Sequence, residues 1–519
     1  MIQVAQIIFI LSVLVILHEF GHYFAAKIFK VRVEKFYLFM DAGFSLFKKK
    51  IGETEWGIGW LPLGGYVKLS GMIDESMDTE QLKQEPQPWE FRSKPAWQRL
   101  IIMMGGIFVN IVLAITIYTV MFSTVGQKYI STEKIQKNGL AFGVVGQHVG
   151  FKNGDKIVSV DGKFIPDFKF AIMGILFSDK VEVNRNGKTI NLSLTDEQKG
   201  EIIKKEGKSF VQTRIELNKI FIDSLDEKKV FTVKRFDKIV GANNKKFTYY
   251  DELISEAKFN KNKSMNLLIN RNAKDTLIVV KINKEGKFVD DFFVNEDYLL
   301  STNKIKDPLE NETLKSNDVI VSLDGKQSNL EFKRALNENK GKTVVLKIKR
   351  DEKIIDVGSR VNEYGKLGIQ FDESKNSEYS IVNKLGLAGA FKEALNQSWN
   401  KVVYNYNSFK LIFRPATGAY TQVKSPIGIA RMLPDTWDWE FVWGFIALFS
   451  IGLAFMNCLP IPGLDGGHAL FTIAEMITGK TLSEKAMANI QTGGMIFLLS
   501  LMVLTFGKDA YQLVMDKFF

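Results

Sequence analysis

The chain is poor in the residues that build disulfide frameworks and metal sites. Its 519 residues include one cysteine, Cys458. A single cysteine excludes an intramolecular disulfide and any zinc site made of several thiolates. Histidine is almost as scarce, with four in the whole chain, at positions 18, 22, 148 and 468. A metal centre would therefore draw on a small set of candidate side chains.

Charged side chains are nearly missing from four stretches, each as long as the roughly 20 apolar residues that cross a bilayer. The stretches are residues 2–26, 100–127, 441–464 and 486–507. A cleaved signal peptide is the alternative for the first stretch, but it lacks a basic start and a small-x-small cleavage site. The sequence predicts a polytopic α-helical membrane protein with four transmembrane helices.

The formal net charge of +11 could suggest a nucleic-acid partner, but the cations concentrate between the first two spans. By the positive-inside rule, this segment is cytoplasmic. The cations are Lys27, Lys30, Arg32, Lys35, Lys48, Lys49, Lys50, Lys68, Lys83, Arg92, Lys94 and Arg99. We therefore expect the lipid bilayer and no nucleic acid as a partner. Four crossings put both termini and the central region on the extracytoplasmic side.

An H-E-x-x-H motif closes the first span, as His18-Glu19-Phe20-Gly21-His22. Residues i and i+4 share one face of a helix, so His18 and His22 can bind one metal ion. Glu19 is placed to take a proton from a water molecule bound to that metal. Ionisable groups inside a membrane are costly, so their presence there indicates function.

A third ligand is needed, since a catalytic zinc usually has three protein ligands and a water. The strongest candidate is Asp465, in the sequence NCLPIPGLDGGH at residues 457–468. Two prolines break the helix there, and paired glycines let the backbone bend around a metal. The alternatives are His468, which we expect to support a ligand or to lie at the membrane interface, and Glu34 or Asp41, nearer to His22 in sequence. His148 reads as an exposed loop residue.

Residues 43–71 alternate apolar and small residues with glycine-rich turns, which indicates β-hairpins beside the membrane. A free strand edge there could pair with an unwound substrate segment. An amphipathic interfacial loop is the alternative. Residues 385–413 have amphipathic helical spacing and are expected to lie on the outer membrane surface or under the central region.

The central region repeats one short pattern three times, at Asp155–Gly162, Asp237–Asn244 and Asp318–Gly325. The pattern, followed by a helix and an alternating strand, resembles the PDZ domain. The middle copy departs from it at Phe236 and at Asn243-Asn244. We expect two PDZ-like domains plus a degenerate PDZ-like insert around residues 200–290. These domains either bind peptide ends or screen access to the site by size.

The expected organisation has four parts. They are an N-terminal membrane core at 1–127, an extracytoplasmic PDZ-like region at 128–373, interfacial amphipathic helices at 374–434, and a C-terminal membrane core at 435–519. The motifs of the two cores together resemble those of the site-2 protease family of intramembrane zinc metalloproteases, and the central insert is most like that of the bacterial regulator-of-sigma-E protease branch.

The resemblance implies that His18, His22 and Asp465 hold Zn2+ and that Glu19 activates water. The family's second span carries G-P-x-x-N, which is similar to residues 106–110 here, with isoleucine in place of the proline. Asn110 and Asn457 would then bind substrate backbone or the developing oxyanion. The alternative for each is an interhelical hydrogen bond.

The implied function is an intramembrane zinc endopeptidase of the inner (cytoplasmic) membrane, with its active site toward the cytoplasm. Its partners would be single-span membrane proteins, anti-sigma-factor-like substrates after a first extracytoplasmic cut, and remnant signal peptides. The competing interpretation is a non-enzymatic membrane scaffold that recruits partners through PDZ-like domains. Glu19 argues against it, because a structural metal site has no use for that carboxylate.

Overall fold

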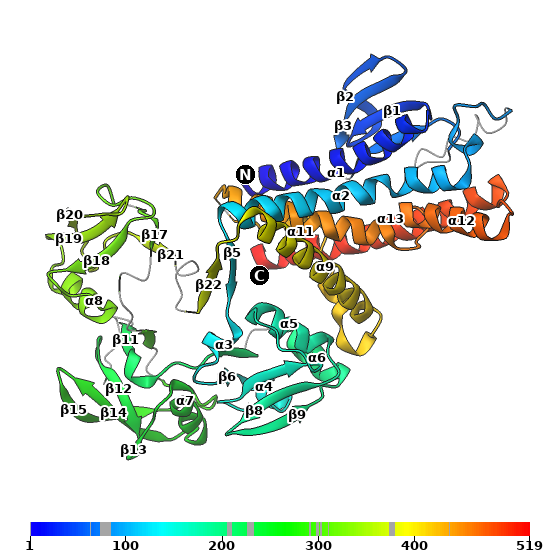
Figure 1. The fold of residues 1–519 in the computed structure, drawn as a ribbon. Helices are drawn as coiled ribbons and strands as arrows, with labels where there is room; N and C mark the ends of the chain where they lie inside the picture. Colours follow the sequence, from blue (N-terminus) through cyan, green and yellow to red (C-terminus); the bar gives the residue numbers. More distant parts are fainter. Residues whose placement is uncertain are drawn as a thin grey trace. The chain divides into compact units, whose positions relative to one another are not determined.

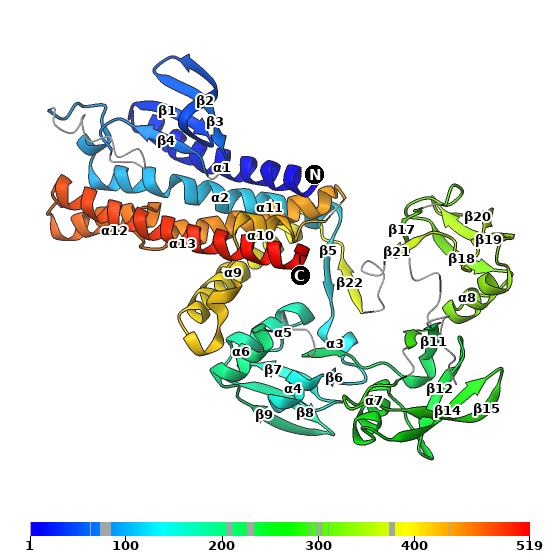
Figure 2. The ribbon, with the colours of Figure 1, turned by 180° about the vertical axis from the view of Figure 1, so that it is seen from behind.

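A computed structural model describes residues 2–62, 64–72, 85–204, 210–225, 233–289, 292–296, 300, 304–309, 311–372, 379–434 and 436–518. They divide into two units (Figures 1 and 2). The membrane unit is Met1–Gln127 with Asn383–Phe519, and the repeat unit is Lys128–Val382. The boundary expected at residues 373 and 374 lies outside the described residues.

Among the described residues of the membrane unit, four helices are long and apolar enough to cross a bilayer, which confirms the four predicted spans. They are α1 (Ile2–Ile28), α2 (Ala96–Thr124), α11 (Trp439–Cys458) and α13 (Glu484–Phe518), of which residues 486–512 form the apolar part. No proline interrupts α2, so it continues through Ile107 as one helix.

The core of the membrane unit lies where α1, α2 and α11 meet α9 (Leu387–Ile412). Small side chains such as Ala114, Ala390 and Ala394 are completely buried there. Lipid provides little hydrophobic drive for helix association, so close packing through small residues holds such helices together. The remaining helices of this unit are α10 (Pro426–Ala430) and α12 (Asp465–Thr478), with 3-10 turns at Phe91–Ser93, Pro415–Thr417 and Ala419–Gln422.

A four-stranded sheet follows α1, in the order β2-β3-β1-β4. Its strands are β1 (Val33–Leu38), β2 (Met40–Ile51), β3 (Thr54–Leu61) and β4 (Tyr66–Leu69). β2 and β3 form an expected hairpin. β4 pairs antiparallel with β1, a strand that was not expected from the sequence. Leu63 lies outside the described residues. Because β4 ends the order of the described strands, it is an edge strand of this part of the sheet.

The repeat unit contains three copies of one arrangement, a strand, a helix and a hairpin. The copies are β7-α5-β8-β9, β12-α7-β14-β15 and β18-α8-β19-β20, each with antiparallel neighbours and its own apolar core. In all three, the pairing of the first two strands shifts register at the same place, after Ile157, Ile239 and Ile320. The middle copy is thus as complete in these elements as its neighbours.

The elements of the first copy are α3 (Thr132–Ile135), β6 (Leu140–Phe142), α4 (Val144–His148), β7 (Lys156–Val160), α5 (Phe168–Phe177), β8 (Val181–Arg185), β9 (Lys188–Leu192), α6 (Asp196–Lys204) and β10 (Val211–Thr213). Those of the second are β11 (Ile220–Leu225), β12 (Lys238–Ala242), β13 (Lys245–Lys246), α7 (Tyr250–Phe259), β14 (Ser264–Arg271), β15 (Lys274–Lys281) and β16 (Phe292–Glu296), preceded by a 3-10 turn at Leu217–Lys219. Those of the third are β17 (Lys304–Asp307), β18 (Val319–Leu323), α8 (Asn329–Glu338), β19 (Thr343–Arg350), β20 (Lys353–Arg360) and β21 (Gln370–Asp372). β5 (Gln127–Ile130) and β22 (Ser380–Asn383) pair where the chain enters and leaves the unit.

The middle copy has the same backbone conformation at the pattern as the other two copies, although its residue types differ there. Asn243 has a φ of 50°, close to the 48° of both Asp161 and Asp324 at the equivalent turn. Asparagine and aspartate both tolerate this left-handed region. Phe236 has a φ of 73°, where the third copy has Asn317 at 72°. A bulky residue is rare in that conformation, so the surrounding fold imposes it.

Candidate metal centre

The last turns of α1 present His18 and His22 on one face of the helix, as their spacing predicts. Each is 7% exposed. α2 passes directly behind them at Gly106, where an added Cβ atom would lie 2.5 Å from His18 Cε1 and His22 Nε2. Only glycine lets the α2 backbone approach the two rings this closely.

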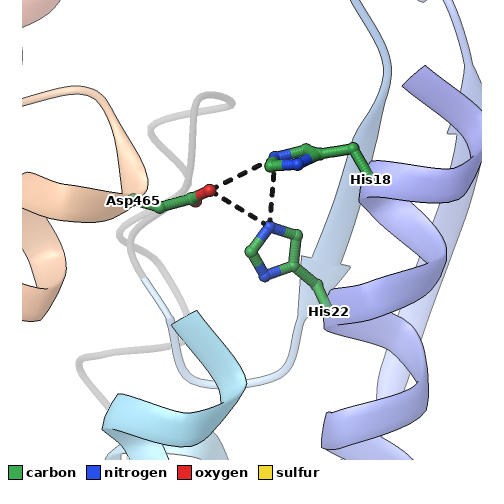
Figure 3. A group of neighbouring side chains, drawn as sticks. All are labelled: His18, His22 and Asp465. Atoms are coloured by element: carbon green, nitrogen blue, oxygen red, sulfur yellow. Dashed lines mark hydrogen bonds and ion pairs between the residues drawn. The ribbon is translucent and has the colours of Figure 1, made fainter. Parts of the chain in front are cut away.

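The second part of the site comes from the loop after α11. That helix ends at Cys458, because Pro460 and Pro462 cannot continue it. A short loop then leads into α12, whose first residue is Asp465. This turn returns the chain to the end of α1 and places the Asp465 carboxylate beside the two histidines (Figure 3).

The three side chains are spaced to fit a tetrahedral metal ion. Asp465 Oδ2 lies 3.2 Å from His18 Nε2 and 3.3 Å from His22 Nε2, and the two histidine nitrogens are 3.4 Å apart. A tetrahedral zinc ion with bonds of ~2.0–2.1 Å holds its ligand atoms roughly 3.3–3.4 Å from each other. The fourth position of such a site is open to water or substrate. The donor set and its geometry therefore fit a catalytic zinc.

Neighbouring groups orient both imidazole rings. His22 Nδ1 lies 2.9 Å from the carbonyl oxygen of Ile102, to which it donates, and this leaves Nε2 free as a ligand. His18 Nδ1 lies 3.2 Å from the amide of Asn110. The Asn110 Oδ1 atom is buried without a partner among the described residues. If the amide group of Asn110 is flipped, its Oδ1 atom accepts a hydrogen bond from the N–H at His18 Nδ1, and both atoms are paired.

The two asparagines predicted to bind substrate differ in their access to the cavity in front of the metal ligands. Asn110 is completely buried behind His18, and the cavity in front of the metal ligands is lined by other residues. Asn457 lines that cavity, and its Nδ2 atom lies 2.9 Å from His18 Nε2 and 3.4 Å from Asp465 Oδ2. Asn457 is thus placed beside the reacting centre, and Asn110 on the far side of a ligand.

A cavity of about 670 Å³ opens in front of the three ligands and is lined by Glu19 as well. Tyr66 and Val67 of the edge strand β4 also line it. Gly65, just before β4, is so close to α1 that an added Cβ atom would lie 3.4 Å from Glu19 Cγ. The carboxylate predicted to act as base and the strand β4 therefore share one cavity with the metal ligands.

The other candidate ligands do not join this group of three. His468, on α12, lines the same cavity, but its Nε2 atom lies 2.9 Å from Gln491 Nε2 on α13. Glu34 accepts a hydrogen bond from Ser70, and Asp41 accepts one from Tyr66. In the repeat unit, His148 is paired with Glu201. Among the described residues, His18, His22 and Asp465 are the one group of three or more such side chains gathered closely enough to hold a metal ion.

The last third of α9, a helix whose sequence pattern indicates no chemistry, lines the same cavity. Asn405, Ser408, Phe409 and Ile412 contribute to its wall. The available signal was the presence of two polar residues, at 405 and 408, on the face that also carries Phe409 and Ile412.

Comparisons with known proteins agree with this chemistry. The model of peptidase family M50 matches residues 6–501. The regulator of sigma-E protease RseP of Escherichia coli is 26% identical over 98% of this chain and 99% of its own length. The metalloprotease MmpA of Caulobacter vibrioides is 30% identical over 38% of this chain and 52% of its own.

Proposed function

This chain belongs to peptidase family M50 and is a zinc metalloprotease of the membrane, and we propose that it cuts transmembrane segments of single-span membrane proteins. The observation that carries the proposal is the position of the ligand set. His18 and His22 lie in the C-terminal half of a helix apolar enough to span the bilayer, and Asp465 follows another. A substrate must therefore reach the site at membrane depth.

In the proposed mechanism, His18, His22 and Asp465 would hold the zinc ion, which would supply Lewis-acid chemistry and lower the pKa of a bound water. Glu19 takes the proton from the attacking water and delivers it to the leaving amine nitrogen. Asn457, whose amide lies beside two ligand atoms, donates a hydrogen bond to the oxygen that becomes negative in the transition state. Asn110 orients His18 from behind.

A transmembrane helix hides its amides in internal hydrogen bonds, so the substrate must unwind before hydrolysis. We propose that the unwound stretch pairs with the outer side of β4, which pairs with no other strand in the described part of the chain and lines the catalytic cavity. Strand addition supplies main-chain partners with little dependence on sequence. Helix-breaking residues in a substrate should then promote cleavage.

The substrates that fit this proposal are anti-sigma-factor-like proteins already shortened by a first extracytoplasmic cut, and remnant signal peptides. RseP, a relative matching nearly the whole chain, is named for regulation of sigma-E. The cationic segment after α1 is cytoplasmic in this proposal, and the repeat unit is extracytoplasmic. The three repeats are PDZ-like domains that bind peptide ends or screen substrates by size.

The deciding experiment is Glu19→Gln in purified protein, assayed on a membrane-span reporter together with zinc content. We expect cleavage to be lost while zinc is retained, because the amide cannot take a proton and the ligands are intact. Unchanged cleavage would overturn the assignment of Glu19. A wild-type protein that binds zinc but leaves every membrane-span reporter uncut, while cutting soluble peptides, would overturn intramembrane proteolysis itself.

A further inference from the structure

Among the described residues, one side-chain donor in the wall of the cavity in front of the metal ligands is buried without a hydrogen-bond partner. Asn405 lies on α9, and its Nδ2 atom is covered by protein without a hydrogen-bond partner among the described residues. Buried polar groups are nearly always paired, so an unpaired amide N–H in a binding cavity suggests a partner that arrives with a ligand. The ligand atom it needs is a hydrogen-bond acceptor.

The surroundings of Asn405 are apolar, so neither the protein nor bulk water readily supplies the hydrogen-bond acceptor that its Nδ2 atom needs. The neighbouring parts of the cavity wall are apolar, including Phe409, Phe449, Leu453 and Phe455. Phe409 and Phe455 pack edge to face, with their ring centroids 6.2 Å apart. A polar group in such a setting interacts strongly with a partner and is costly without one.

The position of α9 relative to the sheet indicates which acceptor it meets. In both views the sheet and α9 lie on opposite sides of the bundle formed by α1, α2 and α11 (Figures 1 and 2). Both elements contribute to the wall of the one cavity. An extended segment has two hydrogen-bonding edges, so pairing with β4 along one edge leaves the carbonyl groups of the other edge facing away from the sheet.

We propose that Asn405 binds the substrate, donating a hydrogen bond from Nδ2 to a backbone carbonyl on the edge of the unwound segment that β4 does not cover. The side chain is a specificity-determining residue for the endopeptidase reaction. It recognises any sequence that has unwound and rejects one that is still helical, whose carbonyl groups are already occupied. This inference rests on the proposed intramembrane cleavage and adds a second contact to it.

The kinetic test compares Asn405→Leu with Asn407→Leu. Asn407 lies two residues along the same helix, is half-buried, and falls outside the set of residues that line the cavity. With a reporter in lipid vesicles, Asn405→Leu should raise the substrate fraction needed for half-maximal rate by roughly three- to tenfold, the effect of one hydrogen bond. The maximal rate and zinc content should stay within about twofold, because one hydrogen bond is lost equally from bound substrate and transition state.

The outcomes separate this inference from the function beneath it. If the wild type does not cut the reporter, the proposed function fails. If the wild type cuts and the two leucine variants behave alike, the function stands and the role of Asn405 is wrong. A fall in zinc content for Asn405→Leu alone would also contradict the inference, because it would mean that the residue supports the metal ligands instead.

A second measurement keeps the inference testable if the leucine variant folds poorly. Cys458 is the one cysteine of the chain, so Cys458→Ala provides a background without thiols. In that background, carrying Glu19→Gln to prevent turnover, Asn405→Cys should form a disulfide with cysteines placed within a few residues of the cut in the substrate. Asn407→Cys should not. Equal cross-linking from both positions, or none from either, would overturn the contact.

Discussion

The metal centre and the repeat unit are specified over very different distances along the chain. Asn457 and His18, which meet at the metal centre, are 439 residues apart. In the repeat unit, each copy is closed by an ion pair between a buried aspartate and a partly exposed arginine over a short span, 30 residues for Arg185 and Asp155 and 32 for Arg350 and Asp318. The first depends on helices from both ends of the chain packing together, and the second on one strand and one hairpin.

The middle copy illustrates how local this specification is. It differs from the other copies at the turn residues of the pattern, but it has the same ion pair. Arg271 donates from Nε and from a terminal nitrogen to the two oxygens of Asp237, at 2.8 and 2.7 Å. Asp237 is 1% exposed, as Asp318 is in the third copy. The pair, with its two parallel hydrogen bonds, therefore specifies this fold more reliably than the turn residues do. Damage to a repeat should remain local, whereas damage to the metal centre should remove the reaction.

The largest effect is expected for Asp465→Ala, which removes one of three ligands. Cleavage of a reporter should fall below detection, and the purified protein should lose its zinc, because two histidines bind the ion far more weakly than three ligands do. Zinc content and reporter cleavage are measured on the same preparation. His148→Ala is the matched control: its ring pairs with Glu201 in the repeat unit, so zinc and activity should be unchanged. Full zinc retention by Asp465→Ala would mean that another residue is the third ligand.

Next in size is Arg271→Ala, which leaves the Asp237 carboxylate buried without its partner. Breaking such a pair costs about 3–5 kcal/mol of stability. Hydrogen exchange of β14 and β15 should rise steeply, while zinc content stays at the wild-type level because the metal ligands lie in the other unit. Exposed Lys274→Ala, in the same hairpin, should change stability by no more than about 0.5 kcal/mol. A loss of zinc with Arg271→Ala would break the separation between the two units.

Much of the fold could be predicted from the sequence because the signals were strong and local. The four spans followed from runs without charge, and the positions of the three repeats followed from their spacing. The pairing of β4 with β1 could not be predicted, since β1 has no alternating pattern in its sequence and its position depends on Trp56 and Tyr66 in later strands. That the middle copy has the same strands and helix as its neighbours could not be predicted for a related reason: Phe236 and Asn243 adopt backbone angles that their residue types rarely or only sometimes prefer.

The candidate site also has residues that could be predicted from the sequence and others that could not. His18, His22 and Asp465 were identified because the chain offers few alternatives and ionisable groups are rare in spans. Asn405 could not be identified, because a polar residue on an amphipathic helix looks like part of its solvated face until the cavity is known. The approach of α2 to the histidines was equally hidden, since it depends on the tertiary fit at Gly106.

A smaller effect is expected where α13 passes the loop before Asp465. A Cβ atom added at Gly494 would collide with the carbonyl group of Pro462, whereas one added at Gly493 meets nothing within 4 Å. Gly494→Ala should therefore push the loop and its aspartate away from the histidines, and a displacement of about 1 Å can cost up to roughly 100-fold in rate. Gly493→Ala, the adjacent control, should retain wild-type cleavage. Equal rates for both variants would show that α13 can move away without disturbing the metal centre.

The smallest effect, and the sharpest test of how far the metal centre extends, is at Asn110. If this residue orients His18, then Asn110→Ala should weaken zinc binding by about 10- to 100-fold, as loss of a group that supports a ligand does. Zinc retention is measured by titration with a competing chelator. Asn110→Asp is the informative companion: a carboxylate accepts the Nδ1 proton of His18 as well as an amide oxygen does, so zinc binding should survive. If Asn110 instead binds substrate, both variants should keep their zinc and require more substrate for half-maximal cleavage. That result would mean that Asn110 does not support His18 as a metal ligand.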